Sequence, residues 1–398
     1  MDLLKEAKAL EPQLIAWRRD LHQIPEVGMN LPQTSAYVQE ELKKMGIPFK
    51  TYCNNIAIVA TLGKGDKVVA LRGDMDALAI PEETGLPFAS KNGCMHACGH
   101  DSHTSMLLTC AKLLKAHEDE LKGTVKLLFQ PAEETFEGAP AMIKEGILEE
   151  HNIQAMFALH NEPMPEYGNG DIVVSVPPMM ASGDFFDIRV KGKGCHGAMP
   201  ESGIDPVVIA AEVIHAIQTM VAREVSSQES AVVSLCSIRS RTADEEQFQK
   251  VYNVIPNCVE IAGTVRTLNS DVQKYVLARL QEIVEGICKT AHAEGTCNIK
   301  PVAPLLVNDA KMVESFRKSA LKLFPAEEIK DLNRPAMGSE DAAFFQEKIP
   351  GCYFYLNTLQ EIDGVVHPLH NSKFTVNESM LHRGPAAMVQ AAMDWLSE

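Results

Sequence analysis

Apolar positions in the first part of the chain alternate between two spacings. Residues 34–46 and 102–117 carry apolar side chains at helical spacing, and Asp101 or Ser102 is available as N-cap of the second helix. A further helix is expected over 137–149. Short apolar runs, typical of buried strands, occupy residues 56–62, 67–74, 124–130 and 155–160. This alternation predicts an α/β fold in which helices cover a mostly parallel sheet.

The pattern changes near Ser182. From there the chain is expected to form, in order, a strand, a helix, two strands, a helix and a strand, at 184–192, 205–224, 231–240, 258–267, 270–293 and 297–303. The order βαββαβ predicts a small α+β, ferredoxin-like sandwich.

Alternation of helices and strands returns after residue 303. We expect a helix over 310–323, a helix opened by GSEDAAFFQ, the strand CYFYLN and a C-terminal helix. These elements predict a larger α/β domain in two segments, 1–182 and 303–398. A smaller dimerisation or lid domain is inserted between them at 183–302. The strand edges and long helices of such an insert favour a homodimer or higher homo-oligomer, and a monomeric lid is the alternative.

Length and charge narrow the possible functions. With 398 residues the chain is long enough for two domains, and 45% apolar and 23% charged residues are typical of a globular protein. The formal net charge of −16 argues against a nucleic acid or an anionic membrane as partner. The acidic N-terminus does not resemble a secretory signal, and no run of 18 apolar residues occurs.

Ten cysteines are scattered along the chain, and some of them, such as Cys236 and Cys352, lie in apolar runs. This usage is typical of buried free thiols in a reducing compartment. We therefore expect a cytoplasmic protein.

Ligand-type residues gather first in the segment MHACGHDSH, where Cys98 and His100 lie two residues apart and Asp101 follows. A thiolate, an imidazole and a carboxylate together suit a borderline-soft divalent cation. The alternative for this segment is a helix-capping loop with an incidental cysteine.

A second group is the pair Glu133 and Glu134 in QPAEE, directly after the predicted strand 124–130. Functional groups in open α/β sheets gather at the carboxyl ends of strands. One of these carboxylates is therefore available for a metal and the other for a proton. A solvated acidic pair at the start of a helix is the alternative.

Histidines follow two more predicted strands. His160 ends AMFALH, and His370 comes shortly after CYFYLN, where His367 competes with it on spacing. Either histidine alone is more often structural, but several ligand-type residues at strand ends would meet at one edge of the sheet. Asp74 and Asp76 belong to the same predicted edge.

Eight segments in order resemble the amidohydrolase branch of the M20 metallopeptidase family: RRDLHQIPEVG, LRGDMDAL, MHACGHDSHT, LLFQPAEE, GCHGAMPESGIDP, NVIPNCVEIAGTVRT, MGSEDAAFF and PLHNSKF. The branch includes hippurate hydrolases, N-acetyl amino acid deacetylases and hydrolases of auxin–amino acid conjugates. Its members have an inserted small domain that commonly mediates dimerisation. The resemblance implies hydrolysis of the amide bond of N-acyl amino acids.

The resemblance also implies the site. Cys98 would bridge two divalent metal ions, with Zn, Mn, Ni and Co all compatible. His100 and His160 would complete one metal position, Glu134 and His370 would complete the other, and Glu133 would be the general base. Other branches have a histidine where this chain has Arg72; a guanidinium cannot be a ligand, so His100 would replace it.

Residues of the insert and of a later segment would contact the substrate. By the resemblance, His196 of GCHGAMPE would stabilise the oxyanion from a partner subunit, and Asn253 would contact substrate. Arg266 suits the α-carboxylate of the substrate because its planar fork can bind both oxygens. Gly338 and Ser339 precede a predicted helix and could offer N–H groups to an anion.

Two rival functions remain open on sequence grounds. A dipeptidase or aminopeptidase would use the same scaffold, but it needs an acidic partner for the substrate ammonium group. A catalytically silent binding protein is the other, and the intact set of metal-ligand and base residues counts against it.

Overall fold

The computed structural model describes residues 2–176, 178–241 and 252–398 of the chain. The chain divides into two compact units, each with its own apolar core. Unit 1 comprises Met1–Met179, Val307–Arg334 and Glu340–Glu398, and unit 2 comprises Met180–Leu306 and Pro335–Ser339.

Pro335–Ser339 belongs to unit 2, although the predicted boundaries place these residues in the segment 303–398. The reason is backbone pairing. The N–H of Ala181 donates to the carbonyl oxygens of Ala336 and Gly338, each at 3.0 Å. Hydrogen bonds to a segment about 155 residues away give no local signal in a sequence.

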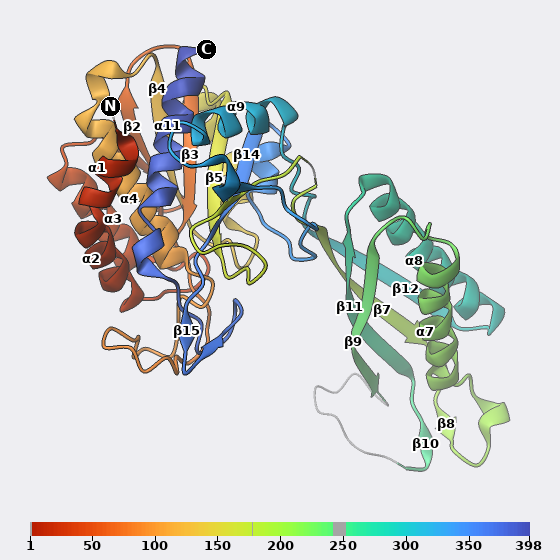
Figure 1. Ribbon diagram of the computed structural model, residues 1–398. Coiled ribbons are helices and arrows are strands. Elements are labelled where there is room, and N and C mark those ends of the chain that lie inside the picture. Colours follow the sequence, from red (N-terminus) through yellow and green to blue (C-terminus); the bar gives the residue numbers. More distant parts are fainter. Residues whose placement is uncertain (1, 177, 242–251) are drawn as a thin grey trace. The chain divides into compact units, whose positions relative to one another are not determined.

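Unit 1 is built on an eight-stranded sheet of order β1-β2-β4-β3-β5-β14-β6-β13 (Figure 1). The strand bounds are β1 Phe49–Tyr52, β2 Ala57–Gly63, β3 Val68–Asp74, β4 Thr124–Gln130, β5 Ala155–Glu162, β6 Ile172–Val173, β13 Ile329–Lys330 and β14 Gly351–Asn357. The four central strands β4, β3, β5 and β14 are mutually parallel. This confirms the predicted α/β fold with a mostly parallel sheet.

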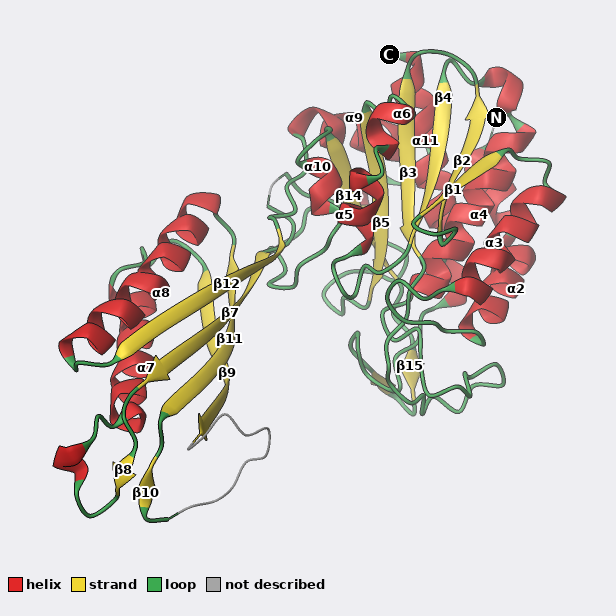
Figure 2. Cartoon of the chain, turned by 180° about the vertical axis from the view of Figure 1, so that it is seen from behind, coloured by secondary structure: helices red, strands yellow, loops and turns green. Residues whose placement is uncertain are grey.

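Helices cover both faces of this sheet, as the opposite views in Figures 1 and 2 show. Helices α4 (His100–Ala116) and α11 (Arg383–Ser397) pack on β3 and β5, while α5 (Gly138–Lys144) packs on β4 and α10 (Ala343–Gln346). Every residue of β3, β4 and β14 is buried, as expected for strands covered on both sides. The remaining helices are α1 Leu3–Ala9, α2 Glu11–His22, α3 Pro32–Lys44, α6 Ile147–Glu150 and α9 Ala310–Ala320. A small hairpin pairs β15 (Glu361–Ile362) with β16 (Val365–Val366).

Several predicted helices differ from the observed ones in their bounds. The predicted helix 137–149 is broken at Gly146, whose φ of +80° belongs to the left-handed region, so α5 and α6 are separate. Helix α9 ends at Ala320, and the helix opened by GSEDAAFFQ is only the four residues of α10. Gly99, not Asp101 or Ser102, is the N-cap of α4.

Unit 2 contains a four-stranded antiparallel sheet of order β12-β7-β11-β9. Its elements are β7 Ser182–Lys191, α7 Pro206–Arg223, β9 Ala231–Arg241, β11 Cys258–Thr267, α8 Ser270–Thr290 and β12 Glu294–Ala303. Their order along the chain is the βαββαβ order of a ferredoxin-like sandwich. A two-stranded ribbon pairs β8 (Cys195–His196) with β10 (Val254–Ile255).

Among the described residues, one helix, α7, is long and apolar enough to cross a membrane by length and composition alone. Its residues Ile209, Val213, Ile217 and Met220 are buried in the core of unit 2. A core helix passes the same test, so this finding is weak evidence for a membrane span.

All ten cysteines are free thiols. Cys352 is buried as expected, but Cys236 is exposed, so the sequence-based expectation was wrong for that thiol. Cys236 lies on β9, the edge strand of the unit 2 sheet, where one side of an apolar run stays uncovered.

Candidate metal centre

The predicted site residues of unit 1 lie at the carboxyl edge of the parallel sheet. Asp74 is the last residue of β3, and Glu133 and Glu134 lie in the turn that follows β4. His160 lies near the end of β5, and His370 lies in the loop after β14. Parallel strands end on the same side, so segments far apart in sequence meet there.

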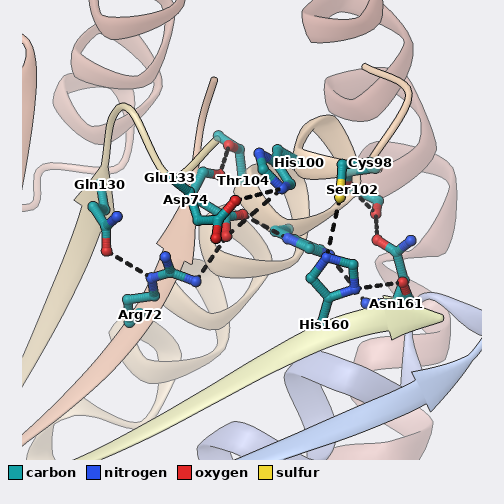
Figure 3. Close-up of polar contacts among 12 residues, drawn as sticks. Arg72, Asp74, Cys98, His100, Ser102, Thr104, Gln130, Glu133, His160 and Asn161 are labelled. Carbon is teal, nitrogen blue, oxygen red and sulfur yellow. Dashed lines mark hydrogen bonds and ion pairs between the residues drawn. The ribbon is translucent and has the colours of Figure 1, made fainter. Parts of the chain in front are cut away.

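Two groups of potential ligands share one cysteine. Ligand atoms of Cys98, His100 and His160 lie within 4.8 Å of one another, and so do those of Cys98, Glu134 and His370. The Sγ of Cys98 is 3.4 Å from Nε2 of His160 (Figure 3). The Nε2 of His370 is 3.3 Å from Oε1 of Glu134. Cys98 therefore stands where a thiolate can contact two ions at once.

Hydrogen bonds to backbone carbonyls fix the orientation of two imidazoles. The Nδ1 of His100 lies 3.0 Å from the carbonyl oxygen of Asp76, and the Nδ1 of His160 lies 2.7 Å from that of Asn161. A carbonyl oxygen only accepts, so Nδ1 of each ring carries the hydrogen. The lone pair of each neutral ring is then on Nε2, the atom that faces the cluster.

The surroundings of one atom, the Nε2 of His100, test whether a cation fits this cluster. This atom is buried and has no hydrogen-bond partner among the described residues. Carboxylate oxygens of Asp74, Glu133 and Glu134 surround it at 3.9, 4.0 and 3.9 Å. These spacings are too long for hydrogen bonds, and they leave the Nε2 lone pair facing a negatively charged surrounding, which suits a cation bound about 2 Å from that nitrogen. The residues therefore fit a divalent cation.

The charges of the cluster also favour a bound cation. Burial lowers the pKa of His100, but Asp74, Asp76 and Glu134 outweigh it and raise that pKa to about 10. Burial, and then the carboxylates Glu134 and Glu133, raise the pKa of the Cys98 thiol well above its ordinary value. Buried carboxylates in excess need a positive charge nearby, and a divalent cation would supply it while taking the place of both protons.

Glu133 differs from its neighbour Glu134. Burial raises the pKa of both carboxyls, but hydrogen bonding by His370 brings that of Glu134 below its ordinary value. The pKa of Glu133 is raised well above its ordinary value by burial and then by Glu340 and Asp341, whose oxygens lie within 4.8 Å. The environment thus makes one carboxylate an ionised ligand candidate and the other a proton acceptor candidate.

Local backbone geometry explains two positions of the site. Gly99 has a φ of +86°, and a Cβ there would lie 2.5 Å from the amide of Asn161, so only glycine fits. His370 has a φ of +63°, which is uncommon for a residue with a side chain. Its N–H donates to the carbonyl of Ala97 at 2.8 Å, which ties His370 to the segment of Cys98. Backbone strain of this kind is typical of functional sites.

A buried network beside the cluster was missed by sequence reasoning. The guanidinium of Arg72 donates to Asp74 at 2.7 Å, to Glu340 at 2.9 Å and to Asp341 at 3.1 Å. Gln130 also accepts from Arg72, as Figure 3 shows. An arginine at the end of a buried strand signals that acids must face it, but the sequence does not say which acids.

Asp76 and Asp101 also proved to be structural partners. The carboxylate of Asp76 accepts the N–H groups of Glu133 and Glu134 at 3.0 and 3.1 Å. Asp101, predicted as a cap or possible ligand, instead accepts from Arg18 at 3.0 Å and His22 at 2.8 Å. The capping prediction for Asp101 was wrong because these partners bury its carboxylate inside the first turn of α4.

The other predicted site residues belong to unit 2, where His196 lies near Asn253 and Arg266 lies near Gly338. His196 pairs with Val254 in the β8–β10 ribbon, and the carbonyl of Asn253 accepts the N–H of Gly197 at 2.8 Å. Arg266 donates to the hydroxyl of Ser339 at 2.8 Å, next to Gly338. Gly183 makes room for Arg266, because a Cβ there would lie 2.0 Å from its Nη1.

Known proteins that are similar to the chain include enzymes that are named for different substrates. The N-acetyl-L-cysteine deacetylase of Bacillus subtilis is 37% identical and covers 96% of the chain and 88% of the relative. The hippurate hydrolase of Campylobacter jejuni is 35% identical with full coverage of both chains. The thermostable carboxypeptidase 1 of Saccharolobus solfataricus is 36% identical and covers 97% of each.

Solved structures and a family comparison agree with these relatives. A Bacillus subtilis structure described as a dinuclear metal binding peptidase from the M20 family has a TM-score of 0.82 and 32% identity, covering 98% of this chain and 99% of that one. Residues 70–394 match the peptidase family M20/M25/M40. The chain therefore belongs to peptidase family M20/M25/M40, as its ordered motifs predicted.

Proposed function

We propose that this protein is a metal-dependent amidohydrolase that cleaves the amide bond of N-acyl amino acids and releases a carboxylate and a free amino acid. The observation that carries the proposal is the pair of ligand groups that share Cys98 beside the buried carboxyl of Glu133. Relatives named as an N-acetyl-L-cysteine deacetylase and a hippurate hydrolase support acetyl and benzoyl groups as the acyl classes to test first.

Two divalent cations are proposed as cofactors, drawn from Zn, Mn, Ni and Co. Cys98 would contact both, His100 and His160 would complete one position, and Glu134 and His370 the other. When bound, the cations supply positive charge that acidifies water and polarises the scissile carbonyl.

Glu133 is proposed to move the proton. Its carboxylate takes a proton from the water whose oxygen attacks the acyl carbon. It returns that proton to the nitrogen as the carbon–nitrogen bond breaks, which gives a carboxylic acid and an amine. The acid then passes its remaining proton to the amine, so that a carboxylate and an ammonium group leave the site. The raised pKa of Glu133 makes its carboxylate a stronger base than that of Glu134, and the positive charge of the bound cations would lower this pKa so that Glu133 is ionised before it accepts the proton.

Arg266 and His196 are proposed to bind the substrate carboxylate and to stabilise the oxyanion, with Asn253 and Gly338 as further contacts. Arg266 lies near the end of β11 and the β8–β10 ribbon precedes its start. The eight residue steps from Cys258 to Arg266 span about 26 Å of strand. One small substrate cannot touch both ends, which supports the proposal that His196 acts on the substrate of a partner subunit.

The proposed homodimer has a direct test by mixing two inactive variants, Glu133→Gln and His196→Ala. In a mixed dimer, one site keeps its own Glu133 and receives the intact His196 of the other copy, so activity should return. If His196 serves its own chain, no site holds both residues and the mixture stays inactive.

A carboxypeptidase activity is a second candidate because a relative with similar identity carries that name. It would release an amino acid with a free carboxylate from a peptide, which is the same bond and the same Arg266 contact. An aminopeptidase or dipeptidase would also need an acid for the substrate ammonium group.

The deciding experiment measures amino acid release from N-acetyl and N-benzoyl amino acids, blocked peptides and free dipeptides, with Mn²⁺ or Zn²⁺ and with a chelator. Chelator-sensitive release from the acyl amino acids, with free dipeptides inert, is expected. Turnover of peptides alone would replace the proposal by the peptidase alternative. A reducing cytoplasm is the proposed location, and the ten free thiols support it.

A further inference from the structure

A third histidine, His103, lies among the proposed ligands. It is buried, with 2% of its surface exposed, and together with Asp74 and His100 it forms a group whose ligand atoms lie within 4.8 Å of one another. By residue type and spacing alone, this group resembles another metal position.

The hydrogen bonds of His103 argue against that reading. The Nε2 of His103 lies 3.0 Å from the backbone nitrogen of Asn161, whose N–H can only donate. The lone pair of His103 is therefore on Nε2, and the hydrogen is on Nδ1. That Nδ1 lies 2.6 Å from Oδ1 of Asp74, which accepts it. Both ring nitrogens are used, and no lone pair is left for a cation.

The same bonds place His103 between two strand ends. Asp74 ends β3, and its second oxygen accepts from Arg72 at 2.7 Å, so the carboxylate cannot turn away. Asn161 directly follows His160 on β5, and its carbonyl accepts from Nδ1 of His160 at 2.7 Å. Figure 3 shows Arg72, Asp74, His160 and Asn161 in this arrangement.

The ring of His103 also contacts both proposed histidine ligands. Its centroid lies 4.5 Å from that of His160, edge to face, and 5.2 Å from that of His100. A ring that is held at both nitrogens and packed against both ligands limits their side-chain rotation. Partners of this kind typically affect metal affinity 10–100-fold without touching the metal.

We propose that His103 is a positioning residue, held as the Nδ1–H tautomer between Asp74 and the backbone of Asn161, which sets the separation of His100 and His160. This inference rests on the proposed function, because it takes His100 and His160 to be metal ligands. The chain then holds two cations and not three.

The test compares wild type with His103→Leu, His103→Gln and His103→Asn. Glutamine can accept at the place of Nε2, asparagine can donate at the place of Nδ1, and leucine does neither. Zn²⁺ affinity is measured by competition with a chromophoric chelator, and zinc content by elemental analysis. Thr109→Val is the control, because Thr109 lies further along α4 and bonds only to the carbonyl of Ser105 among the described residues.

We expect wild type and Thr109→Val to bind two zinc ions alike. In His103→Leu the affinity for at least one of the two zinc ions should be about 10–100-fold lower than in wild type. The affinities of His103→Gln and His103→Asn should lie between those of wild type and His103→Leu. Unchanged affinity in His103→Leu, or a fall from three zinc ions to two, would overturn the inference. Wild type that binds no zinc would instead overturn the proposed function.

A spectroscopic measurement on wild type, for which the variants serve only to assign resonances, reports the tautomer of His103 directly. Long-range ¹H–¹⁵N correlation spectra of histidine-labelled, zinc-loaded protein distinguish protonated from unprotonated ring nitrogens. The resonances of His103, assigned by their loss in His103→Gln or His103→Asn, should show hydrogen on Nδ1 and a lone pair on Nε2. The opposite tautomer, or a doubly protonated ring, would contradict the proposal.

Discussion

The backbone N–H of Glu133 donates a hydrogen bond of 3.0 Å to Oδ1 of Asp76. The other oxygen of the same carboxylate accepts from the N–H of Glu134 at 3.1 Å, and Nδ1 of His100 lies 3.3 Å from Oδ1. One buried aspartate thus orients the proposed base and two proposed ligands, although it belongs to neither ligand group.

Asp76→Ala should therefore weaken metal binding about 10–100-fold and lower turnover, because Glu133 and Glu134 lose their common acceptor and His100 keeps only its bond to the backbone carbonyl of residue 76. Metal affinity and kcat, measured on the same preparation, check this. Asp66→Ala, at an exposed turn between β2 and β3, is the matched control and should behave as wild type. Equal behaviour of the two variants would show that the Asp76 contacts do not matter for the site.

Neighbouring glutamates should give opposite phenotypes. Glu133→Gln is expected to keep its metals and lose about 10²–10⁴-fold in kcat, since only the proton acceptor is removed. Glu134→Gln should lose metal, since an ionised oxygen near His370 is removed. Elemental analysis beside kcat separates the two, with Glu137→Gln as an exposed control. Loss of metal from Glu133→Gln would make Glu133 a ligand.

Gly183→Ala should act through Arg266. The new Cβ would lie 2.0 Å from Nη1 of Arg266 and displace the guanidinium. We expect KM to rise for N-acyl amino acids with a free carboxylate and to change little for their amides, as in Arg266→Ala. Gly286→Ala, on α8 with open space around it, is the control. An equal effect of Gly183→Ala on acids and amides would exclude the carboxylate contact.

Metal affinity should rise with pH. Without a cation, His100 has a pKa of about 10 and the Cys98 thiol has a pKa well above its ordinary value, so both hold protons at pH 7. Burial lowers the pKa of His160, which is then already neutral. The pKa of His370 is also raised, by its hydrogen bond with Glu134, so binding should release at least two protons, and apparent affinity should rise about 100-fold or more per pH unit between pH 6 and 8. Calorimetry in buffers of different ionisation enthalpy counts these protons; a count of zero would contradict the assignment of Cys98 and His100.

The α/β fold and the neighbourhood of the site could be predicted from sequence. Runs such as TVKLLFQ and AMFALH identify buried strands by composition alone, and parallel strands end at one edge. Ligand-type residues after several strands must therefore meet, as Cys98, Glu134, His160 and His370 do. The start of helix α4 was predicted less accurately. Asp101 is a residue type that often caps helices, but its carboxylate accepts hydrogen bonds from Arg18 and His22 instead.

Only the tertiary structure decided the roles that depend on partners from distant segments. Which nitrogen of His100 and His103 has the lone pair follows from backbone groups of other segments, the carbonyl of Asp76 and the N–H of Asn161. The acids that face Arg72 come from positions 340 and 341. The sequence determines which chemical groups are available and to which edge of the sheet they go, because strand burial is a local property. It cannot determine hydrogen-bond partners across that edge, because these depend on how segments hundreds of residues apart pack together.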